Sequence, residues 1–327
     1  MSRIVRTLVA VDPALELESV AGSIPEGEGV HIVGVFGDLD EARAKLTSLP
    51  FDLLVVASVG YSDRTLLLVD AAREVGPGRS VRVLVNDRSP GLAGARNTGI
   101  RAAQGAFVAF CDDDDEWLRS KLRKQVSVVL LPAAPDVAVT GITIVSGSRT
   151  IDRISESDAI TVEDLLRSRV QEVHPSSILA RRAPLIDGRI GLVDEAIPGS
   201  YGEDYEWLLR AAKTGPIAVV RAPLVRVHWH RSSFFADRWT TIIEAIQYLI
   251  RKHPEFRTEK RGLARLYGRL AFANAAAGNR TEARAWARRT LTLDLRERRA
   301  YLAILVSTGL VSANTLMRLA NRVGRGI

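Results

Sequence analysis

Short apolar runs alternate with amphipathic segments over the first 110 residues of the chain. The apolar runs predict strands at residues 5–11, 30–35, 53–56, 81–85 and 106–110. Between them, apolar residues recur at helical spacing and predict helices at 13–21, 38–49, 63–74 and 94–104. Short strands separated by amphipathic helices are typical of a parallel sheet built from βαβ units. The N-terminal part is therefore expected to be an α/β structure.

The pattern changes along the rest of the chain. We expect a helix at 117–130, a strand at 137–145, a helix at 203–214 and strands at 217–221 and 225–229. Residues 146–200 are more polar and less periodic. Beyond residue 236 the periodicity is helical, at 240–252, 260–277, 281–293 and 298–306. The chain is thus expected to hold an α/β domain at 1–235 and a helical region at 236–327.

Four consecutive aspartates, Asp112–Asp115, directly follow the apolar run at 106–110. Charged carboxylates are rarely buried unless they are paired or bound to a metal, so core packing does not explain this run. The carboxyl end of a strand is where α/β sheets bind ligands. Carboxylate oxygens there suit Mg²⁺ or Mn²⁺ and, through the cation, a diphosphate. The plainer interpretation is a solvated acidic turn that caps the helix expected to begin at Trp117.

The residues around this run form an ordered set of motifs. The first block reads Ala95-Arg96-Asn97-x-Gly99-Ile100, then Phe110-x-Asp112-Asp-Asp114-Asp115-x-Trp117. The second reads His174-Pro175-Ser176-Ser177, then Glu203-Asp204-Tyr205-Glu206-Trp207, then Pro223-Leu224-Val225 followed by His230. Over about residues 80–235, these motifs resemble the core of family 2 glycosyltransferases with the GT-A fold.

The resemblance implies a GT-A-type, Rossmann-like mixed α/β sheet flanked by helices, with a C-terminal helical extension. It also implies a metal-dependent, inverting hexosyltransferase that uses Mn²⁺ or Mg²⁺. Such an enzyme moves a sugar from a nucleotide-diphosphate sugar to the hydroxyl of a glycan, a lipid-linked sugar or a small molecule. The nucleotide-binding half would be residues 1–88, and the metal and acceptor half residues 89–235.

The same resemblance assigns roles to single residues. Asp204 matches the catalytic base, although Glu203 and Asp204 would also stabilise the first turn of a helix. The predicted metal ligands are Asp112, Asp114, Asp115 and His230. The predicted donor-binding residues are Arg96, Asn97, Asp112 and Asp113. Asn97 has a bracing alternative, and His174 and His228 are weaker candidates with structural alternatives.

The N-terminal half departs from the family pattern. Ala57 and Ser58 stand where the family has paired aspartates that help to hold the nucleotide base. Residues 28–75 also look like a two-component receiver domain, but they lack the aspartate that such a domain phosphorylates. These departures keep open a catalytically inactive GT-A-like scaffold or partner-binding subunit. A nucleotidylyltransferase lacks its Gly-rich loop here, and a metallohydrolase using Asp112–Asp115 with His228 and His230 fits the order of the motifs less well.

Charge is distributed unevenly. Residues 256–327 hold 15 Lys and Arg against 4 Asp and Glu, whereas the remainder holds 30 against 34. A nucleic-acid partner is therefore not expected, and the basic helices are compatible with contact with an anionic membrane surface or with a homodimer arm. The single cysteine, the short apolar run at the N-terminus and the lack of an 18-residue apolar stretch predict a cytoplasmic protein, or one peripheral to the cytoplasmic membrane face.

Overall fold

The computed structural model describes residues 7–10, 53–56, 80–84, 86–112, 115–131, 134–147, 149–170, 173–228 and 238–322. The chain divides into two compact units. The first, called the sheet unit, comprises Met1–Thr161, Val170–Glu195 and Glu203–His230. The second, called the helical unit, comprises Val162–Arg169, Ala196–Gly202 and Arg231–Ile327. The boundary predicted between residues 235 and 236 lies outside the described residues.

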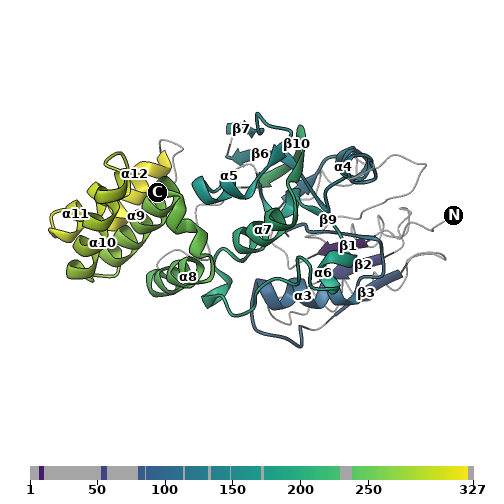
Figure 1. The fold of residues 1–327 in the computed structure, drawn as a ribbon, viewed down its shortest axis with the longest axis horizontal. Coiled ribbons are helices and arrows are strands. Elements are labelled where there is room, and N and C mark those ends of the chain that lie inside the picture. The colour runs from purple at the N-terminus through teal and green to yellow at the C-terminus, as the bar shows by residue number, and fades with distance from the viewer. Residues whose placement is uncertain are drawn as a thin grey trace. The chain divides into compact units, whose positions relative to one another are not determined.

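The sheet unit contains two sheets (Figure 1). The first is parallel and has the order β1-β2-β3, from Thr7–Ala10, Leu53–Val56 and Ser80–Val83. These strands confirm three of the predicted ones. The predicted strand at 30–35 and the helices at 13–21, 38–49 and 63–74 lie outside the described residues.

The second sheet has seven strands and mixed directions, with the path β4-β9-β6-β10-β5. Strand β7 pairs with β6, and β8 pairs with β10. Strands β6 and β10 are parallel, and β4 shares their direction because β9 runs antiparallel to both β4 and β6. The bounds are β4 Phe107–Ala109, β5 Asp115–Trp117, β6 Val137–Ser146, β7 Arg149–Arg153, β8 Ala159–Ile160, β9 Leu179–Arg181 and β10 Ile217–His228.

Two local predictions are wrong in this sheet. The helix predicted for 117–130 begins later, as α4 Lys121–Val129, because Asp115–Trp117 instead form β5 and pair with 225–227 of β10. The two strands predicted at 217–221 and 225–229 are one strand, β10. Its pairing with β6 is irregular around Pro223, which has no N–H to donate to a ladder.

The helices of the sheet unit are α3 Leu92–Ala102, α4, α6 Ala183–Ile186 and α7 Glu203–Thr214, together with the short 3₁₀ turn η2 Pro175–Ser177. Helix α4 packs Leu122, Val126 and Val129 on the sheet, at the spacing that places side chains on one helix face. The buried amide of Gln125 donates hydrogen bonds to the carbonyls of Ala138 and Ser177, each at 2.8 Å. These contacts fix the segment that carries the aspartates.

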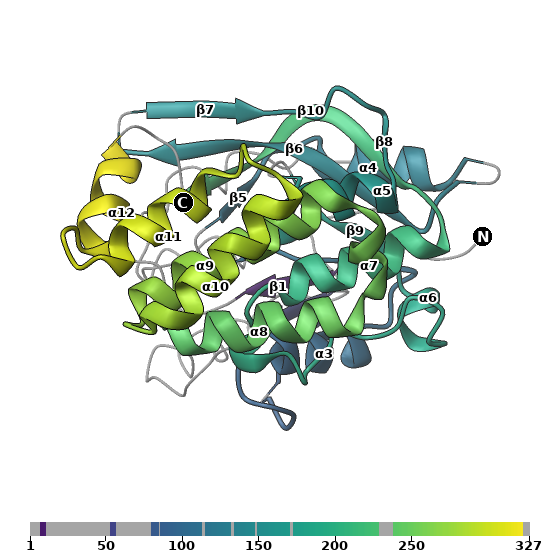
Figure 2. The ribbon, with the colours of Figure 1, turned by 60° about the vertical axis from the view of Figure 1, so that its left-hand side comes forward.

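The helical unit consists of α5 Val162–Arg167, α8 Trp239–Lys252, α9 Lys260–Ala276, α10 Arg280–Leu293, α11 Arg298–Ser307 and α12 Ala313–Arg322, with the 3₁₀ turns η3 Pro198–Ser200 and η4 Pro254–Thr258. Helices α9, α10 and α11 lie side by side (Figures 1 and 2). Their shared core is rich in alanine, which allows close approach of the helices: Ala271, Ala275, Ala283, Ala287, Ala300 and Ala303. Among the described residues, no helix combines the length and apolarity needed to span a bilayer.

Candidate functional site

The acidic run lies at the carboxyl end of β4. The N–H of Asp115 donates a hydrogen bond of 3.1 Å to the carbonyl of Asp112, which closes a turn between β4 and β5. This turn presents the carboxylates of Asp112 and Asp115 at the edge of the sheet where ligands are expected. Asp113 and Asp114 lie outside the described residues, so their predicted roles stay predictions.

Helical turn η2 brings a serine and a histidine to these aspartates. The Ser176 hydroxyl donates to Asp115 Oδ2 at 2.5 Å and accepts the Asp112 N–H at 2.9 Å. His174 Nδ1 lies 3.1 Å from Asp115 Oδ2, and its Nε2 lies 4.0 Å from Asp112 Oδ2. The ligand atoms of Asp112, Asp115 and His174, called the acidic cluster, all lie within 4.8 Å of one another.

This cluster fits a divalent cation. Asp115 Oδ1 is buried and has no hydrogen-bond partner, an arrangement that is costly for a carboxylate oxygen unless a ligand completes it. Two carboxylates and an imidazole are a donor set that Mn²⁺ accepts, and the carboxylates alone suit Mg²⁺. Asp112 and Asp115 were predicted for this role from the motif, whereas His174 was a weaker candidate.

The carboxylates around His174 raise the pKa of its imidazole. Burial alone would lower the pKa of His174, but Asp115, Asp112 and Asp204 raise it above its usual value. The Ser176 N–H donates to Nδ1 at 3.4 Å, and the same ring nitrogen lies 3.1 Å from Asp115 Oδ2. The carboxylates of the acidic cluster therefore favour a positive charge beside them, either on the His174 imidazole or on a bound cation.

Arg96 on α3 joins the acidic cluster to a second pair of carboxylates. Its Nη2 donates to Asp112 Oδ1 at 2.9 Å, and its Nη1 donates to Glu203 Oε1. Burial would lower the pKa of Arg96, but Glu203, Asp112 and Asp204 raise it above its ordinary value. The guanidinium therefore stays charged and connects the carboxyl end of β4 to the start of α7. Its predicted contact with the donor stays a prediction.

Glu203 and Asp204 occupy the first turn of α7 and are buried. Burial raises the pKa of Glu203 to about 7, with Asp204 and Asp112 adding to the effect and Arg96 opposing it. Asp112 and Glu203 both pair with one guanidinium, and burial beside other carboxylates makes Glu203 easier to protonate. Asp204 also acts on His174 and Arg96 electrostatically, which puts the predicted base near both.

Asn97 and Glu195 hold the loop that precedes this pair. The Asn97 side chain accepts the Val193 N–H and donates to the Val193 carbonyl, both at 2.8 Å, and it donates to Glu195 at 2.7 Å. Although burial opposes the change, hydrogen bonds from Asn97, Arg88 and Ser89 lower the pKa of Glu195 to about 2. The observed contacts of Asn97 are bracing contacts. Its predicted role in donor binding is not tested by them.

His228 and His230 lie two positions apart, and the structure describes only the first of them. His228 Nε2 lies 3.1 Å from Glu116 Oε1, so its ring pairs with the residue next to Asp115. His230 lies outside the described residues and stays a predicted ligand. Ser176 was not among the predicted site residues. The only available signal was its place in the His-Pro-Ser-Ser motif.

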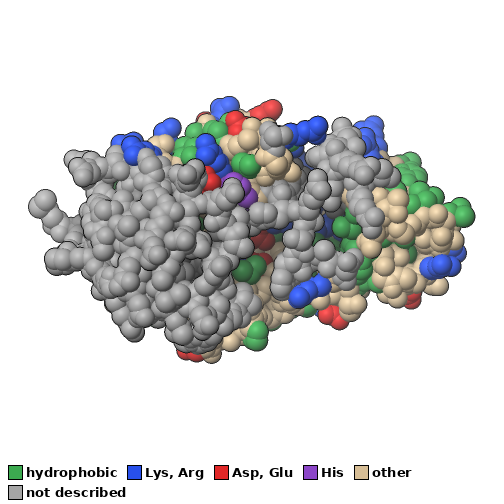
Figure 3. All heavy atoms as spheres, turned by 180° about the vertical axis from the view of Figure 1, so that it is seen from behind, with side chains coloured by type: hydrophobic (Ala, Val, Ile, Leu, Met, Phe, Trp, Pro, Cys, Tyr) green, Lys and Arg blue, Asp and Glu red, His purple; other side chains and the backbone are tan. Residues whose placement is uncertain are grey.

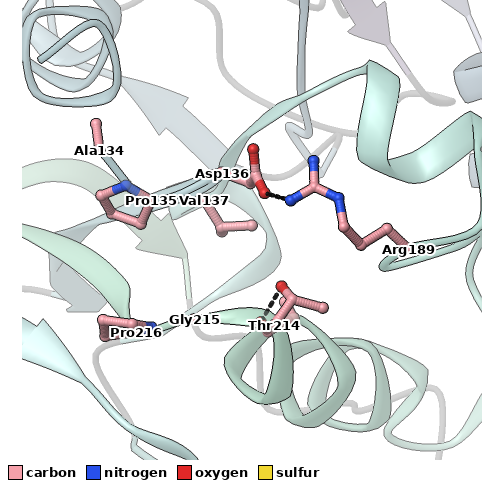
Figure 4. Close-up of a pocket in the computed structure, with 9 residues that line it drawn as sticks. Ala134, Pro135, Asp136, Val137, Arg189, Thr214, Gly215 and Pro216 are labelled. Carbon is pink, nitrogen blue, oxygen red and sulfur yellow. Dashed lines mark hydrogen bonds and ion pairs between the residues drawn. The ribbon is translucent and has the colours of Figure 1, made fainter. Parts of the chain in front are cut away.

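A pocket of about 240 Å³ lies at the amino ends of strands in the second sheet (Figure 4). It is formed where β6 and β10 begin, by Ala134, Pro135, Asp136, Val137, Arg189, Ala211, Thr214, Gly215 and Pro216. Arg189 Nη1 pairs with Asp136 Oδ2 at 2.5 Å across it. Strands β4, β6 and β10 run in the same direction. The pocket lies where β6 and β10 begin and the acidic cluster lies where β4 ends, so the two are at opposite ends of the strands. The pocket is therefore separate from the site at Asp112.

Comparison with known proteins gives a consistent picture. The model of the family described as Glycosyl transferase family 2 matches residues 39–186. The Escherichia coli UDP-Glc:α-D-GlcNAc-diphosphoundecaprenol β-1,3-glucosyltransferase WfgD is 46% identical over 50 residues, which are 15% of this chain and 20% of WfgD. The succinoglycan biosynthesis protein ExoO of Rhizobium meliloti is 30% identical over 174 residues, 50% of this chain and 47% of ExoO. The chain therefore spans less than half the length of these curated relatives.

Among solved structures, S. aureus TarS 1–349 in complex with UDP-GlcNAc has a TM-score of 0.58 and 16% identity. The match covers 98% of this chain and 93% of that one. At this identity the likeness concerns the fold. It confirms the predicted mixed α/β sheet of the GT-A type with a C-terminal group of helices.

Proposed function

Because residues 39–186 match the family model described as Glycosyl transferase family 2, we propose that this chain transfers a sugar from a nucleotide-sugar donor to an acceptor hydroxyl, with inversion and with a divalent cation. The observation that carries the proposal is the bridge made by Arg96 between Asp112 and Glu203. It links a cation-binding group of carboxylates to the pair that contains the predicted base.

Asp112 and Asp115 would hold Mn²⁺ or Mg²⁺, with His174 as a third ligand for Mn²⁺. The orphaned Asp115 Oδ1 and the spacing of the ligand atoms support this assignment. Asp114 and His230 remain proposed ligands from the sequence motif. A bound cation would neutralise the charge that develops on the departing nucleoside diphosphate.

The residues of the chain supply the remaining steps. Asp204 accepts the proton of the acceptor hydroxyl while the hydroxyl oxygen forms a bond with the anomeric carbon. The bond from that carbon to the diphosphate oxygen breaks, and attack from the opposite face inverts the configuration. Arg96 fixes α7 against the acidic cluster, so that base and leaving group are positioned together.

Names of the relatives suggest the first substrates to test. The name of WfgD includes UDP-Glc and a diphosphoundecaprenol-linked sugar, and the structure of TarS was solved with UDP-GlcNAc. We therefore propose a UDP-hexose as donor and a glycan or lipid-linked sugar as acceptor.

We also propose that the helical unit contacts an anionic membrane surface. Tyr301, Ile304 and Leu305 form an exposed stripe on α11, and Leu295 and Leu310 flank it, 70% and 82% exposed. Hydrophobic and basic side chains are interspersed over this unit at the right of Figure 3. The excess of arginine in residues 256–327 favours an anionic lipid surface as the partner of this stripe. Sedimentation with phosphatidylglycerol vesicles should decrease in Ile304→Asp, and dimerisation of the lipid-free chain would contradict the assignment.

A thermal-shift series tests the enzyme proposal. The full chain is heated with UDP-, GDP- or dTDP-sugars, with and without Mn²⁺. We expect one nucleotide to raise Tm only when Mn²⁺ is present. Absence of any shift with all three nucleotides would instead support the inactive scaffold, which lacks base-binding aspartates at positions 57 and 58.

A further inference from the structure

Ser176 joins the two aspartates of the acidic cluster. The residue is fully buried, and its hydroxyl makes two hydrogen bonds of opposite direction. The hydroxyl donates to Asp115 Oδ2 at 2.5 Å and accepts the backbone N–H of Asp112 at 2.9 Å. A serine hydroxyl has a single hydrogen, so this hydrogen is committed to Asp115. Ser176 therefore acts on the acidic cluster through the aspartates.

The turn that carries Ser176 is held from both sides. Trp117 Nε1 donates a hydrogen bond of 2.7 Å to the Ser176 carbonyl. On the other side, the Ser177 hydroxyl donates to the His174 carbonyl at 2.7 Å and accepts the His174 N–H at 3.2 Å. These bonds fix the backbone on each side of Ser176, so its hydroxyl has a defined position relative to Asp115.

The two oxygens of the Asp115 carboxylate have different surroundings. Oδ2 accepts the Ser176 hydroxyl and also lies 3.1 Å from His174 Nδ1. Oδ1 is buried and has no hydrogen-bond partner among the described residues. A buried carboxylate oxygen without a donor is costly unless a ligand completes it. Ser176 thus occupies one oxygen of Asp115 and leaves the other for a cation.

Asp112 shows the same division between its two oxygens. Arg96 Nη2 donates to Asp112 Oδ1 at 2.9 Å, whereas Asp112 Oδ2 lies 4.0 Å from His174 Nε2. Each aspartate therefore has one oxygen that is paired within the protein and one that remains for a ligand. Mg²⁺ and Mn²⁺ take single carboxylate oxygens in octahedral sites, whereas Ca²⁺ takes about six to eight oxygens and often both oxygens of one carboxylate.

We propose that Ser176 is a positioning residue that selects the cation. Its hydroxyl holds Asp115 Oδ2 and so restricts Asp115 to ligation through Oδ1, which favours Mn²⁺ and Mg²⁺ over Ca²⁺. The inference rests on the proposed function, because it concerns the cation that the acidic cluster would bind there. A serine that only braces the turn would instead affect the binding of all divalent cations alike.

Calorimetric titration of the full chain, without nucleotide sugar, tests the proposal. The chain is freed of metal with EDTA, dialysed, and titrated separately with manganese and calcium chloride. We expect Mn²⁺ to bind at least about tenfold more tightly than Ca²⁺. Ser176→Ala should raise the Kd for Mn²⁺ about tenfold and change the Kd for Ca²⁺ less than about twofold, because a released Asp115 Oδ2 suits the larger cation. The ratio of the two constants is the readout.

Ser177→Ala is the matched control. Ser177 is also fully buried in the same turn, and the printed sequence places it beside Ser176, but its hydroxyl bonds to the backbone of His174 and to neither aspartate. This variant should keep the ratio of the unmodified chain, whatever its Tm.

Trp117→Phe is a second test that does not depend on the folding of Ser176→Ala. It keeps an aromatic ring and removes the N–H that holds the Ser176 carbonyl. The preference for Mn²⁺ over Ca²⁺ should fall by about threefold, since one hydrogen bond that positions the serine is lost.

Three results would overturn the proposal. The first is equal binding of both cations by the unmodified chain. The second is an equal loss of affinity for both cations in Ser176→Ala, and the third is an unchanged ratio in Ser176→Ala and in Trp117→Phe. Each of these leaves the Mn²⁺-dependent donor shift, and with it the proposed function, intact. If the unmodified chain binds neither cation, the proposed cation site fails together with this inference, so the two failures are distinguishable.

Discussion

The acidic cluster and the pair formed by Glu206 and Arg210 on α7 show two ways in which the sheet unit accommodates charged side chains. In the acidic cluster, Asp115 Oδ1 is buried and has no hydrogen-bond partner within the described part of the chain. Elsewhere in the sheet unit, comparable charges are matched internally. Arg210 holds both oxygens of Glu206 and the carbonyls of Ile190 and Leu192. Matched charges brace the fold, whereas unmatched charges indicate a partner from outside.

The largest expected effect is on the base. Asp204→Asn removes the proton acceptor but keeps the size of the side chain, so turnover should fall by about a thousandfold while the donor Kd changes less than about twofold. Steady-state kinetics and donor titration measure the two quantities separately. Asp158→Asn, at a side chain that is 84% exposed, is the control. Normal turnover by Asp204→Asn would show that another group accepts the proton.

The next effect concerns the cation. Chelation with EDTA should remove the donor-induced rise in Tm, and added Mn²⁺ should restore it. Asp115→Asn should weaken Mn²⁺ binding by about a hundredfold, because one of the charged ligands becomes a neutral amide. Calorimetric titration of Mn²⁺ measures this directly. Equal affinity in Asp115→Asn would separate the acidic cluster from cation binding and weaken its contrast with the paired Glu206 and Arg210.

Substitution of Asn97, whose side chain is hydrogen-bonded within the protein, should instead lower the stability of the fold. Asn97→Ala leaves the buried N–H and carbonyl of Val193 without their side-chain partners. We expect the free energy of unfolding to fall by about 3 kcal/mol. Urea denaturation measures it, with Gln104→Ala, exposed beyond the end of the same helix, as the control. If stability is unchanged but donor binding is lost, Asn97 contacts the donor and is not a brace.

The smallest effect is a pH dependence. The pKa of Glu203 is raised to about 7 in the folded state, so its contribution to stability is complete below pH 4.5 and is lost as the pH rises through 7. Between pH 5 and 8 the metal-free chain should lose about 2 kcal/mol from this group. Glu203→Gln should lack that component in denaturant unfolding at the two pH values. An identical loss in the variant would assign the pH dependence to other groups, His174 among them.

Much of the secondary structure was predictable from local pattern. Leu53–Val56 is an apolar run of strand length, and α9 shows helical periodicity, so both were expected where they occur. The start of α4 was misplaced because helical spacing continues through Glu116 and Trp117, whereas pairing with Val225 and Arg226 of β10 draws these two residues into a strand. That pairing joins residues about 110 positions apart, and periodicity contains no information about it.

The parts of the candidate site differ in the same way. Asp112 and Asp115 lie three positions apart in the sequence, so their chemistry could be predicted from the motif alone. Ser176 comes from another element, and its contacts with the two aspartates join residues about 60 positions apart. Only the packing of η2 against the end of β4 shows that this serine belongs to the site.

The shared guanidinium of Arg96 has a consequence for how this site should be dissected. The Arg96 guanidinium pairs with Asp112 and Glu203 at once. A substitution of either carboxylate therefore frees an N–H donor of Arg96 that can turn to the other carboxylate. Single changes will therefore misstate what each carboxylate contributes, and the double variant should depart from the sum of the two singles. A thermodynamic cycle through Asp112→Asn and Glu203→Gln would measure how strongly the two halves of the reaction are tied together.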